Sequence, residues 1–398
     1  MTGYRFLDGV RVLEFAQFAS SSLGGLLADF GADVVKVEAP GRGDPVRQLG
    51  EWAVGGPDGP GFNHLRWNRG KRGIALDLRS APDREVWLDL AARADVVIEG
   101  MRAGVLDRLG LGYDVLRQRA PRLVFCSLTG LGASGPYHTL GSHGHLYDAY
   151  CALLEPEFDG DGAVHRPQRR AVEVGIHAAG LYAAVGVLSA LRNAEVTGQG
   201  ARLEVANCDA ASAWLPGSVE VELNRSRISV RADQTMGGSV GGWPRVEFYR
   251  CADGKLISLQ AMEAKFWANF CAECGRGDLI GEPSSDDPAV KSALWAELSA
   301  IFASRSRAEW IEAFVSADIA GGPVNTLAEL AADPHFLARS NTYDSTVDGT
   351  PEVRLIASPV RVDGATFAPE PPPAPGADQA AVLRDWLGAG AVPRRPPT

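Results

Sequence analysis

Short apolar runs alternate with helical patterns through the first 205 residues, and this alternation limits the folds open to the chain. Strand patterns are expected at residues 10–15, 32–37, 95–99, 123–128 and 201–205. Helical patterns are expected at residues 81–94, 113–120 and 176–193, with a further helix that ends at Gly31. Strands that alternate with helices build a parallel sheet covered on both faces. The sequence therefore predicts a doubly wound α/β domain over residues 1–215.

The character of the chain changes near residue 215. Residues 225–243 are polar and Gly-rich, which is typical of a flexible loop that can cover a site. A hairpin is expected at 246–259, turning at Asp253-Gly254, and helices at 265–274, 289–302 and 307–317. These elements predict a small α+β domain over residues 225–335. Strand patterns return from residue 342, followed by a Pro-rich linker and a helix at 379–387.

Composition and net charge argue against several classes of function. The net charge of −10 disfavours a general nucleic-acid or membrane-surface binder, because anionic phosphates would be repelled. The first residues lack a signal-peptide profile and no apolar run of membrane-spanning length is expected, so we expect a cytoplasmic protein. The six cysteines are expected to be reduced. Cys271 and Cys274 have no second pair to complete a zinc site, so no metal is expected.

Residues 127–154 form the first candidate site. A buried strand pattern ends in a Gly-rich turn, and His138, His143 and His145 follow. Ligands of α/β sheets collect at the carboxyl ends of strands, and imidazoles can move protons near neutral pH. The competing interpretation is that these loop histidines are only solvated. Glu173 and His177 bracket the start of the next helix, where a simple helix-end role is the alternative.

Basic residues gather in turns of this acidic chain. Arg69, Lys71 and Arg72 surround Gly70, and others stand in separate turns, namely Arg42, Arg47 and Arg108. Such turns favour a bound polyanion of modest size, such as a nucleotide phosphate, with exposed surface charge as the alternative. The first strand–helix turn lacks GxGxxG, so an NAD site is not expected.

A series of motifs, taken together and in order from Gly9 to Arg339, resembles the class III CoA-transferase family (CaiB/BaiF type). They are GVRVLEFAQFASSSLGGLLADFGADVVKVEAPGRGDPVR, NRGKRGIALDL, ADVVIEGMRAGVLDRLGLGYDVL, SLTGLGASGPY, VGVLSAL, TGQGARLEV, GGPVNTLAEL and DPHFLAR. The family includes formyl-CoA and carnitine CoA-transferases and alpha-methylacyl-CoA racemase. The resemblance implies a Rossmann-like large domain, an inserted small domain, a C-terminal return over 342–398, and an interlocked homodimer.

The resemblance also implies coenzyme A as the cofactor, in the form of an acyl-CoA substrate. Carried onto this sequence, it places CoA near Phe18, Ala19, Arg42, Lys71, Arg72, Met101 and Arg108. The partners it implies are acyl-CoA and a carboxylic acid acceptor, and a heterodimer with a paralogue is the alternative to a homodimer.

The chain departs from the family at the reacting groups. The catalytic Asp of the transferases corresponds to Ile176, and the acid of the racemases to Gly175. The catalytic His of the racemases falls on His143. Glu173 or Asp148 could replace the missing carboxylate, and His177 could act as a second proton-transfer group.

Three functions follow from this resemblance. The first is transfer of CoA between an acyl-CoA thioester and a carboxylic acid. The alternative is racemase or epimerase chemistry, in which His143 moves the proton α to the thioester. The third is a non-catalytic subunit that only binds acyl-CoA.

Overall fold

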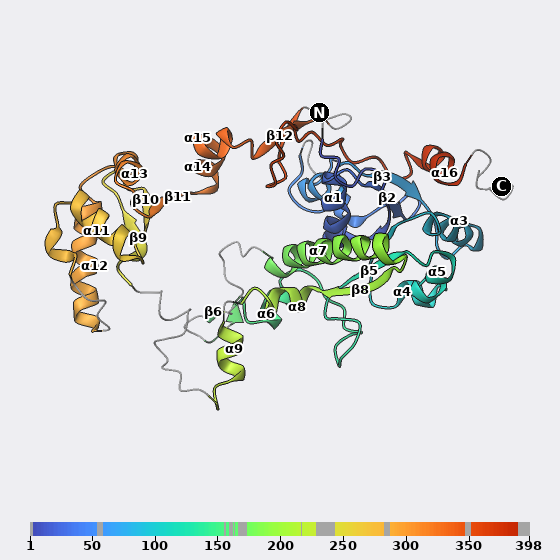
Figure 1. Ribbon diagram of the computed structural model, residues 1–398, viewed down its shortest axis with the longest axis horizontal. Helices are drawn as coiled ribbons and strands as arrows, with labels where there is room; N and C mark the ends of the chain where they lie inside the picture. The colour runs from blue at the N-terminus through green and yellow to red at the C-terminus, as the bar shows by residue number, and fades with distance from the viewer. Residues whose placement is uncertain are drawn as a thin grey trace. The chain divides into compact units, whose positions relative to one another are not determined.

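The computed structural model divides into two compact units, residues 1–215 with 340–398, and residues 216–339. It describes residues 3–53, 59–154, 157–158, 162, 164–165, 173–215, 217–227, 243–281, 287–346 and 352–388. Most of the expected 225–243 loop, residues 228–242, lies outside this description. Figure 1 shows the chain coloured from its N-terminus to its C-terminus.

A six-stranded sheet in the order β3-β2-β1-β4-β5-β8 forms the centre of the large unit, and every pairing in it is parallel. Its strands are β1 (Arg11–Ala16), β2 (Asp33–Glu38), β3 (Arg72–Ala75), β4 (Val96–Gly100), β5 (Val124–Thr129) and β8 (Ala201–Ala206). All six residues of β5 are buried, as a strand covered on both faces requires. The predicted α/β class with a parallel sheet is confirmed.

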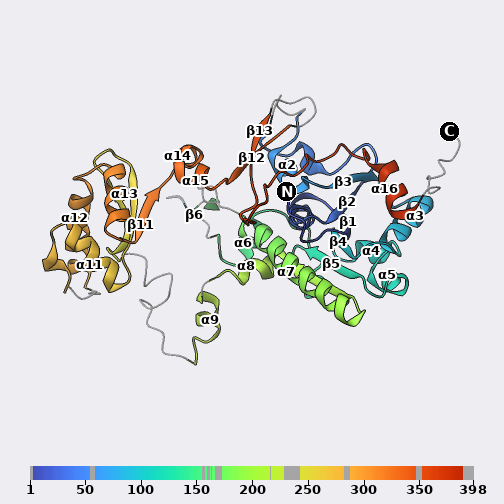
Figure 2. The same cartoon turned by 45° about the horizontal axis from the view of Figure 1, so that its top comes forward.

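Helices cover both faces of this sheet (Figures 1 and 2). They are α1 (Ser22–Asp29), α2 (Phe62–Asn68), α3 (Ala81–Ala91), α4 (Val105–Arg108), α5 (Tyr113–Arg119), α6 (Leu146–Tyr150), α7 (Val174–Thr197), α8 (Asn207–Ser212) and α16 (Gln379–Leu387). One apolar core joins the sheet to Trp87 of α3, Leu116 of α5 and Trp386 of α16. A second core joins the opposite face to Leu23 of α1 and Ala183 of α7. The doubly wound arrangement therefore has a core on each side.

Helix α7 is long and apolar enough to cross a membrane, which the sequence analysis did not expect. The helix runs for 24 residues, from Val174 to Thr197, and extends two residues before and four residues beyond the predicted range of 176–193. Its inner face packs on the sheet through Ala178, Ala183 and Val187, and a core helix meets the same length and composition criteria. The small side chains of this inner face let α7 lie close to the strands.

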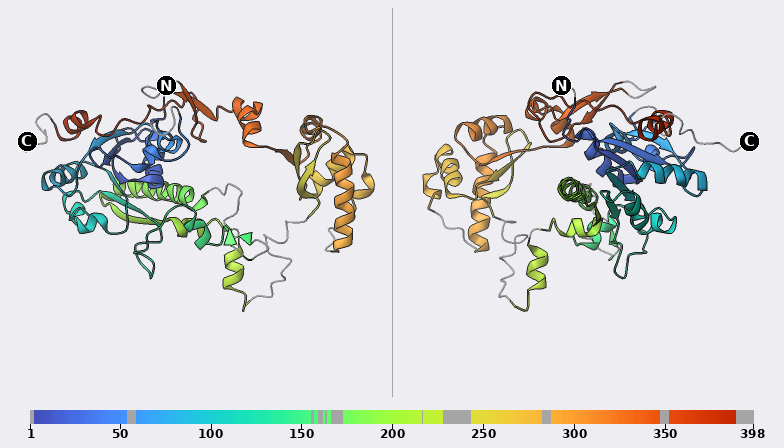
Figure 3. Two further views of the ribbon diagram at one scale, coloured as in Figure 1. Left: turned by 180° about the vertical axis from the view of Figure 1, so that it is seen from behind. Right: turned by 45° about the vertical axis from the view of Figure 1, so that its right-hand side comes forward.

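The C-terminal segment returns to the large unit and covers the edge strand β3 (Figure 3). The N–H of Gly73 donates to Asp378 Oδ2 at 2.8 Å, and the N–H of Ala75 donates to Gln379 Oε1 at 2.9 Å. These contacts satisfy donors that an open sheet edge would leave exposed. The segment also contains the antiparallel pair β12 (Thr342–Ser345) and β13 (Val353–Ile356).

The small unit is built on an antiparallel sheet in the order β11-β10-β9. Its strands are β9 (Val246–Arg250), β10 (Leu256–Gln260) and β11 (Gly321–Val324), and its helices include α9 (Ser218–Leu223), α11 (Ala264–Glu273), α12 (Pro288–Phe302), α13 (Arg307–Ser316), α14 (Leu327–Ala332) and α15 (Pro334–Ala338). Trp267, Phe302 and Trp310 form an aromatic core. The hairpin at 246–259 lies where the sequence predicts it, and β11 adds a strand that the sequence analysis missed.

Candidate functional site

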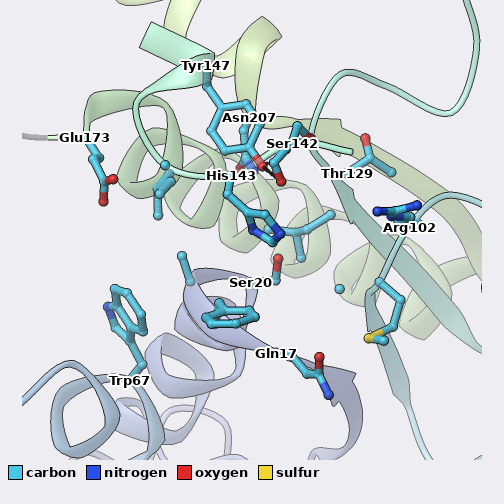
Figure 4. Close-up of a pocket in the computed structure, with 18 of the residues that line it drawn as sticks. Gln17, Ser20, Trp67, Arg102, Thr129, Ser142, His143, Tyr147, Glu173 and Asn207 are labelled. Atoms are coloured by element: carbon cyan, nitrogen blue, oxygen red, sulfur yellow. Dashed lines mark hydrogen bonds between the residues drawn. The ribbon is translucent and has the colours of Figure 1, made fainter. Parts of the chain in front are cut away.

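A cavity of about 530 Å³ opens at the carboxyl ends of the central strands of the large unit. The residues that line it come from the ends of β1, β4, β5 and β8, from α2, and from the loops around α6 and α7. They are Gln17, Phe18, Ala19, Ser20, Leu49, Asn63, Trp67, Gly100, Met101, Arg102, Leu128, Thr129, Gly130, Ser142, His143, Gly144, Tyr147, Glu173, Ile176 and Asn207. In Figure 4, His143 points into the space above Ser20, with Glu173 and Trp67 to one side and Arg102 to the other.

Phe18 begins a short 3₁₀ turn, η1 (Phe18–Ser21), directly after β1. Its φ of 53° is in the left-handed region, which disfavours residues that carry a Cβ. Its ring meets the imidazole of His143 edge-on, with ring centres 5.5 Å apart and planes at 65°. Two residues far apart in the sequence therefore form one wall of the cavity.

The loop that carries His143 passes close to the start of α7. The hydroxyl of Tyr147 donates to the carbonyl oxygen of Ser142 at 3.0 Å and holds the loop from within. Gly144 has a φ of 58°, and a Cβ there would lie 2.9 Å from Glu173 Oε1. Glycine at this position therefore allows the carboxylate of Glu173 to approach the backbone beside His143. Glu173 Oε1 also lies 4.0 Å from His145 Nε2.

The side chain of Ile176 lines the cavity at the position where the resemblance implies a catalytic Asp. The preceding residue, Gly175, is tightly enclosed, since a Cβ there would lie 2.9 Å from the carbonyl oxygen of Asn207 and 3.0 Å from Tyr147 Cβ. This chain therefore has no acidic residue at position 175 or 176. Among the described residues that line the cavity, Glu173 is the one that carries a carboxylate.

Asp148 has a different environment from Glu173. Its side chain is buried, and it accepts hydrogen bonds from the N–H groups of Val174 at 3.1 Å and Gly175 at 2.8 Å. Free N–H groups at a helix N-terminus need such acceptors. Asp148 therefore caps α7 from a neighbouring element and does not line the cavity.

His177 is half-buried on α7 and does not line the cavity either. Burial lowers its pKa, the positive charge of Arg66 lowers it further, and Asp148 opposes both effects. The structure therefore brings together two of the four candidate catalytic residues, His143 and Glu173. It leaves Asp148 and His177 outside the cavity.

The residues expected to hold CoA divide into three groups. Phe18, Ala19 and Met101 line the cavity. Arg42 is exposed in a turn, and Arg108 is exposed at the end of α4, where it donates to the carbonyl oxygen of Ala103 at 3.2 Å. Lys71 and Arg72 are already engaged by protein groups.

The ammonium of Lys71 is enclosed in the protein. It lies 2.6 Å from Glu14 Oε2, and it donates to the carbonyl oxygen of Ser21 at 2.7 Å and to Asn68 Oδ1 at 3.0 Å. Burial lowers the pKa of Lys71 to about 8, although Glu14 opposes the change. Lys71 therefore stabilises the turn that ends at Ser21, and it does not line the cavity.

Arg72 makes ion pairs of 2.5 Å with Asp33 and 2.9 Å with Asp385. Both of its carboxylate partners belong to the large unit, and Arg72 does not line the cavity.

Arg102 carries an exposed guanidinium that lines the cavity, and it was not among the predicted site residues. Its guanidinium lies close to Gly141, where a Cβ would meet Arg102 Nη2 at 2.9 Å. The signal was its place directly after Met101, at the carboxyl end of β4. Asn63, Trp67 and Asn207 were also missed, and they reach the cavity only through tertiary packing.

Among the described residues, no group of three or more His, Cys, Asp or Glu side chains is arranged to hold a metal ion. The polar groups of the cavity wall are mainly amides, hydroxyls, one imidazole, one carboxylate and one guanidinium. These groups suit an organic ligand with polar and anionic parts.

A doubly wound parallel sheet with a partly apolar cavity at the carboxyl ends of its strands is the arrangement in which α/β proteins commonly bind their ligands. The chain belongs to CoA-transferase family III, whose family profile matches residues 7–379. It is therefore a member of a transferase family that acts on acyl-CoA. The family resemblance seen in the sequence is confirmed.

The relatives of this chain support the same assignment. A probable fatty acyl-CoA transferase of Mycobacterium tuberculosis, Rv3272, is 30% identical over 392 residues that cover 95% of this chain and 97% of its own. The succinate–glutarate CoA-transferase of Agrobacterium fabrum is 29% identical and covers 95% of each chain. A crystal structure of a CaiB/BaiF family protein from Brucella suis is 28% identical, with a TM-score of 0.77, covering 96% of this chain and 100% of its own.

Proposed function

We propose that this protein transfers CoA between an acyl-CoA thioester and a carboxylic acid, with Glu173 as the reacting carboxylate. The observation that carries the proposal is that Glu173 and His143 line one cavity with Phe18, Ala19 and Met101. Relatives named as CoA-transferases support the reaction class.

The chemistry needs a carboxylate at the thioester carbonyl. Glu173 would attack this carbonyl, releasing CoA thiolate and forming an acyl-glutamyl anhydride. The thiolate would then attack the glutamyl carbonyl, giving a glutamyl-CoA thioester and the free acid. Attack by the acceptor acid on this thioester, followed by return of the thiolate, gives the new acyl-CoA and restores Glu173.

His143 would stabilise the negative charge that forms on the carbonyl oxygen, because its imidazole faces the same space as Glu173 (Figure 4). The apolar part of the wall, which includes Trp67, Leu128 and Ile176, would hold the acyl group. Arg102 would pair with an anionic group of the ligand.

Proton transfer at the carbon α to the thioester is the second candidate. It is favoured by the exposure of His143 to the cavity, where a neutral imidazole can act as a base. Glu173 lines the same cavity and could return the proton, whereas His177 does not. A third candidate, binding of acyl-CoA without turnover, predicts neither reaction.

One experiment separates these functions. The purified protein is incubated in heavy water with 2-methylacyl-CoA or succinyl-CoA and an isotope-labelled acid, and products are followed by mass spectrometry. CoA transfer predicts labelled acyl-CoA that is lost in Glu173→Gln and kept in Glu195→Gln, an exposed glutamate on α7. Deuterium at the α carbon without transfer would overturn the proposal in favour of proton transfer. Binding without either product would favour the third candidate.

We also propose that a second copy of this chain, or a paralogue, covers the outer face of α7. Leu181, Tyr182 and Val185 are 44–65% exposed there and form a shallow apolar hollow with Trp214. Light scattering tests this: Val185→Glu should reduce the particle mass to that of one chain. Val315→Glu, at an exposed valine of α13, should not change it.

A further inference from the structure

A network of buried charges lies directly beneath the turn that carries Phe18. Lys36 Nζ lies 3.1 Å from Glu14 Oε1 and 2.9 Å from Asp44 Oδ2, and all three side chains are almost inaccessible. The same ammonium donates to Ser21 Oγ at 2.6 Å and to the carbonyl oxygen of Ala16 at 2.8 Å. The ammonium of Lys36 therefore links Asp44 to Ser21, the last residue of η1.

Asp44 uses its other oxygen on the backbone of the turn. Its Oδ1 accepts from the N–H of Phe18 at 3.1 Å and from the N–H of Val46 at 3.0 Å. Burial raises the pKa of Asp44, but Lys36 and the backbone donors more than offset this and the pKa is lowered overall. The carboxylate is therefore ionised at neutral pH and accepts both bonds.

The conformation of Phe18 needs such support. A φ of 53° is unfavourable for a residue with a Cβ, and such strain persists only where surrounding contacts enforce it. In this conformation the ring of Phe18 contacts the imidazole of His143. Asp44 itself does not line the cavity.

We infer that Asp44 is a positioning residue, which holds Phe18 in its left-handed conformation and thereby sets the orientation of His143. The assignment of acyl-CoA as the ligand of this wall rests on the proposed function. Without the Asp44 carboxylate, Phe18 relaxes toward negative φ and its ring leaves His143. Only the fraction of molecules that keep the turn then binds ligand, so affinity for CoA falls about tenfold.

NMR of histidine-labelled protein tests the link without using activity. The His143 signal is identified by its loss in His143→Gln, and its ring-current shift is compared in wild type, Phe18→Ala and Asp44→Ala. We expect Asp44→Ala to change the His143 shift as Phe18→Ala does. Asp44→Asn, which keeps an acceptor for the N–H of Phe18, should retain most of the shift. Asp29→Ala, a matched loss of a buried carboxylate paired with Arg69, should leave it unchanged.

Binding of CoA by the same variants, measured by calorimetry, separates this inference from the proposed function. Loss of both the shift and the affinity in Asp44→Ala supports both. A wild-type shift in Asp44→Ala overturns the positioning role. A lost shift with unchanged affinity supports the positioning role and contradicts CoA binding at this wall.

A second pair of variants applies if Asp44→Ala does not fold. Phe18→Gly adopts the left-handed turn without support, because glycine has no Cβ. The positioning role predicts that Phe18→Gly binds CoA equally well with and without the additional change Asp44→Leu, which is similar in size to Asp and removes the acceptor. A further loss of affinity when Asp44→Leu is added to Phe18→Gly would overturn it, because Asp44 would then act by a route other than the turn.

Discussion

The carboxylate of Asp148 caps α7 by accepting a 2.8 Å hydrogen bond from the N–H of Gly175. This contact joins the His143 loop to the helix that begins beside Glu173. Asp148 is one of the two carboxylates predicted from the sequence as a possible nucleophile, and these hydrogen bonds hold it at the N-terminus of α7.

Asp148→Ala should lower the free energy of unfolding by about 1–2 kcal/mol, because two helix N–H groups lose their acceptor. Asp148→Asn, which keeps one acceptor oxygen, should remain folded and retain CoA transfer. Chemical denaturation and the transfer assay measure the two effects. A stable but inactive Asp148→Asn would instead identify Asp148 as the nucleophile.

Ile176→Asp should increase CoA transfer at least about tenfold, since it places a second carboxylate on the cavity wall where reactive groups gain from proximity. Ile176→Asn is the matched control, with similar shape and no nucleophile, and should show no increase. Initial rates with succinyl-CoA measure both. Equal rates for the two variants would place the reacting carbonyl away from this wall.

Arg102→Ala should weaken CoA binding roughly 5- to 30-fold and reduce its dependence on salt, because an exposed guanidinium of the cavity wall would lose an anionic partner. Arg72→Ala should change affinity less than about twofold, since Asp33 and Asp385 already pair with its guanidinium. Calorimetry at two salt concentrations tests both. A larger loss of CoA affinity in Arg72→Ala than in Arg102→Ala would mean that Arg72 binds the anionic group of the ligand.

His64 should make the protein acid-sensitive. Burial, followed by the charges of Arg47 and Lys36, lowers its pKa to about 3 from an ordinary value of 6.5. Arg47 Nη1 lies 3.1 Å from His64 Nε2 and can only donate, so this nitrogen is unprotonated. The unfolded chain therefore binds the extra proton between pH 6.5 and 3, and stability is lost as the pH falls through this range.

His64→Gln should flatten this loss by up to about 1.4 kcal/mol per pH unit below about pH 6. His335→Gln, at an exposed position, should leave the slope unchanged. Urea unfolding between about pH 7 and 4.5 gives the slopes. Parallel curves for wild type and His64→Gln would mean that His64 is protonated in the native state.

Much of the fold could be predicted because local pattern and final environment agree. The last helix, α16, has the predicted bounds of 379–387, and the strand expected at 10–15 is shifted by one residue in β1. Strand β11 was missed because Gly-Gly-Pro-Val has no strand pattern. It pairs with β10, and glycine at position 321 permits this pairing, because a Cβ there would collide with the carbonyl oxygen of Ser258.

The site was harder to predict than the sheet, because sequence gives residue types without their partners. Lys71 is basic and lies in a turn, but Glu14, 57 positions away, binds its ammonium. Glu173 directly precedes α7 and His177 lies in its first turn, yet of these two residues only Glu173 lines the cavity. The direction in which each of these side chains points, and the group that it contacts, depend on how α7 packs on the sheet.

Covalent trapping tests the central claim most directly. The protein is mixed with acyl-CoA, quenched, digested, and searched by mass spectrometry for a carboxyl group that carries CoA. Glu173 acting as the nucleophile predicts a glutamyl-CoA thioester on the peptide that contains Glu173, absent from Glu173→Gln. A CoA adduct on any other carboxylate, or undiminished transfer by Glu173→Gln, would contradict it.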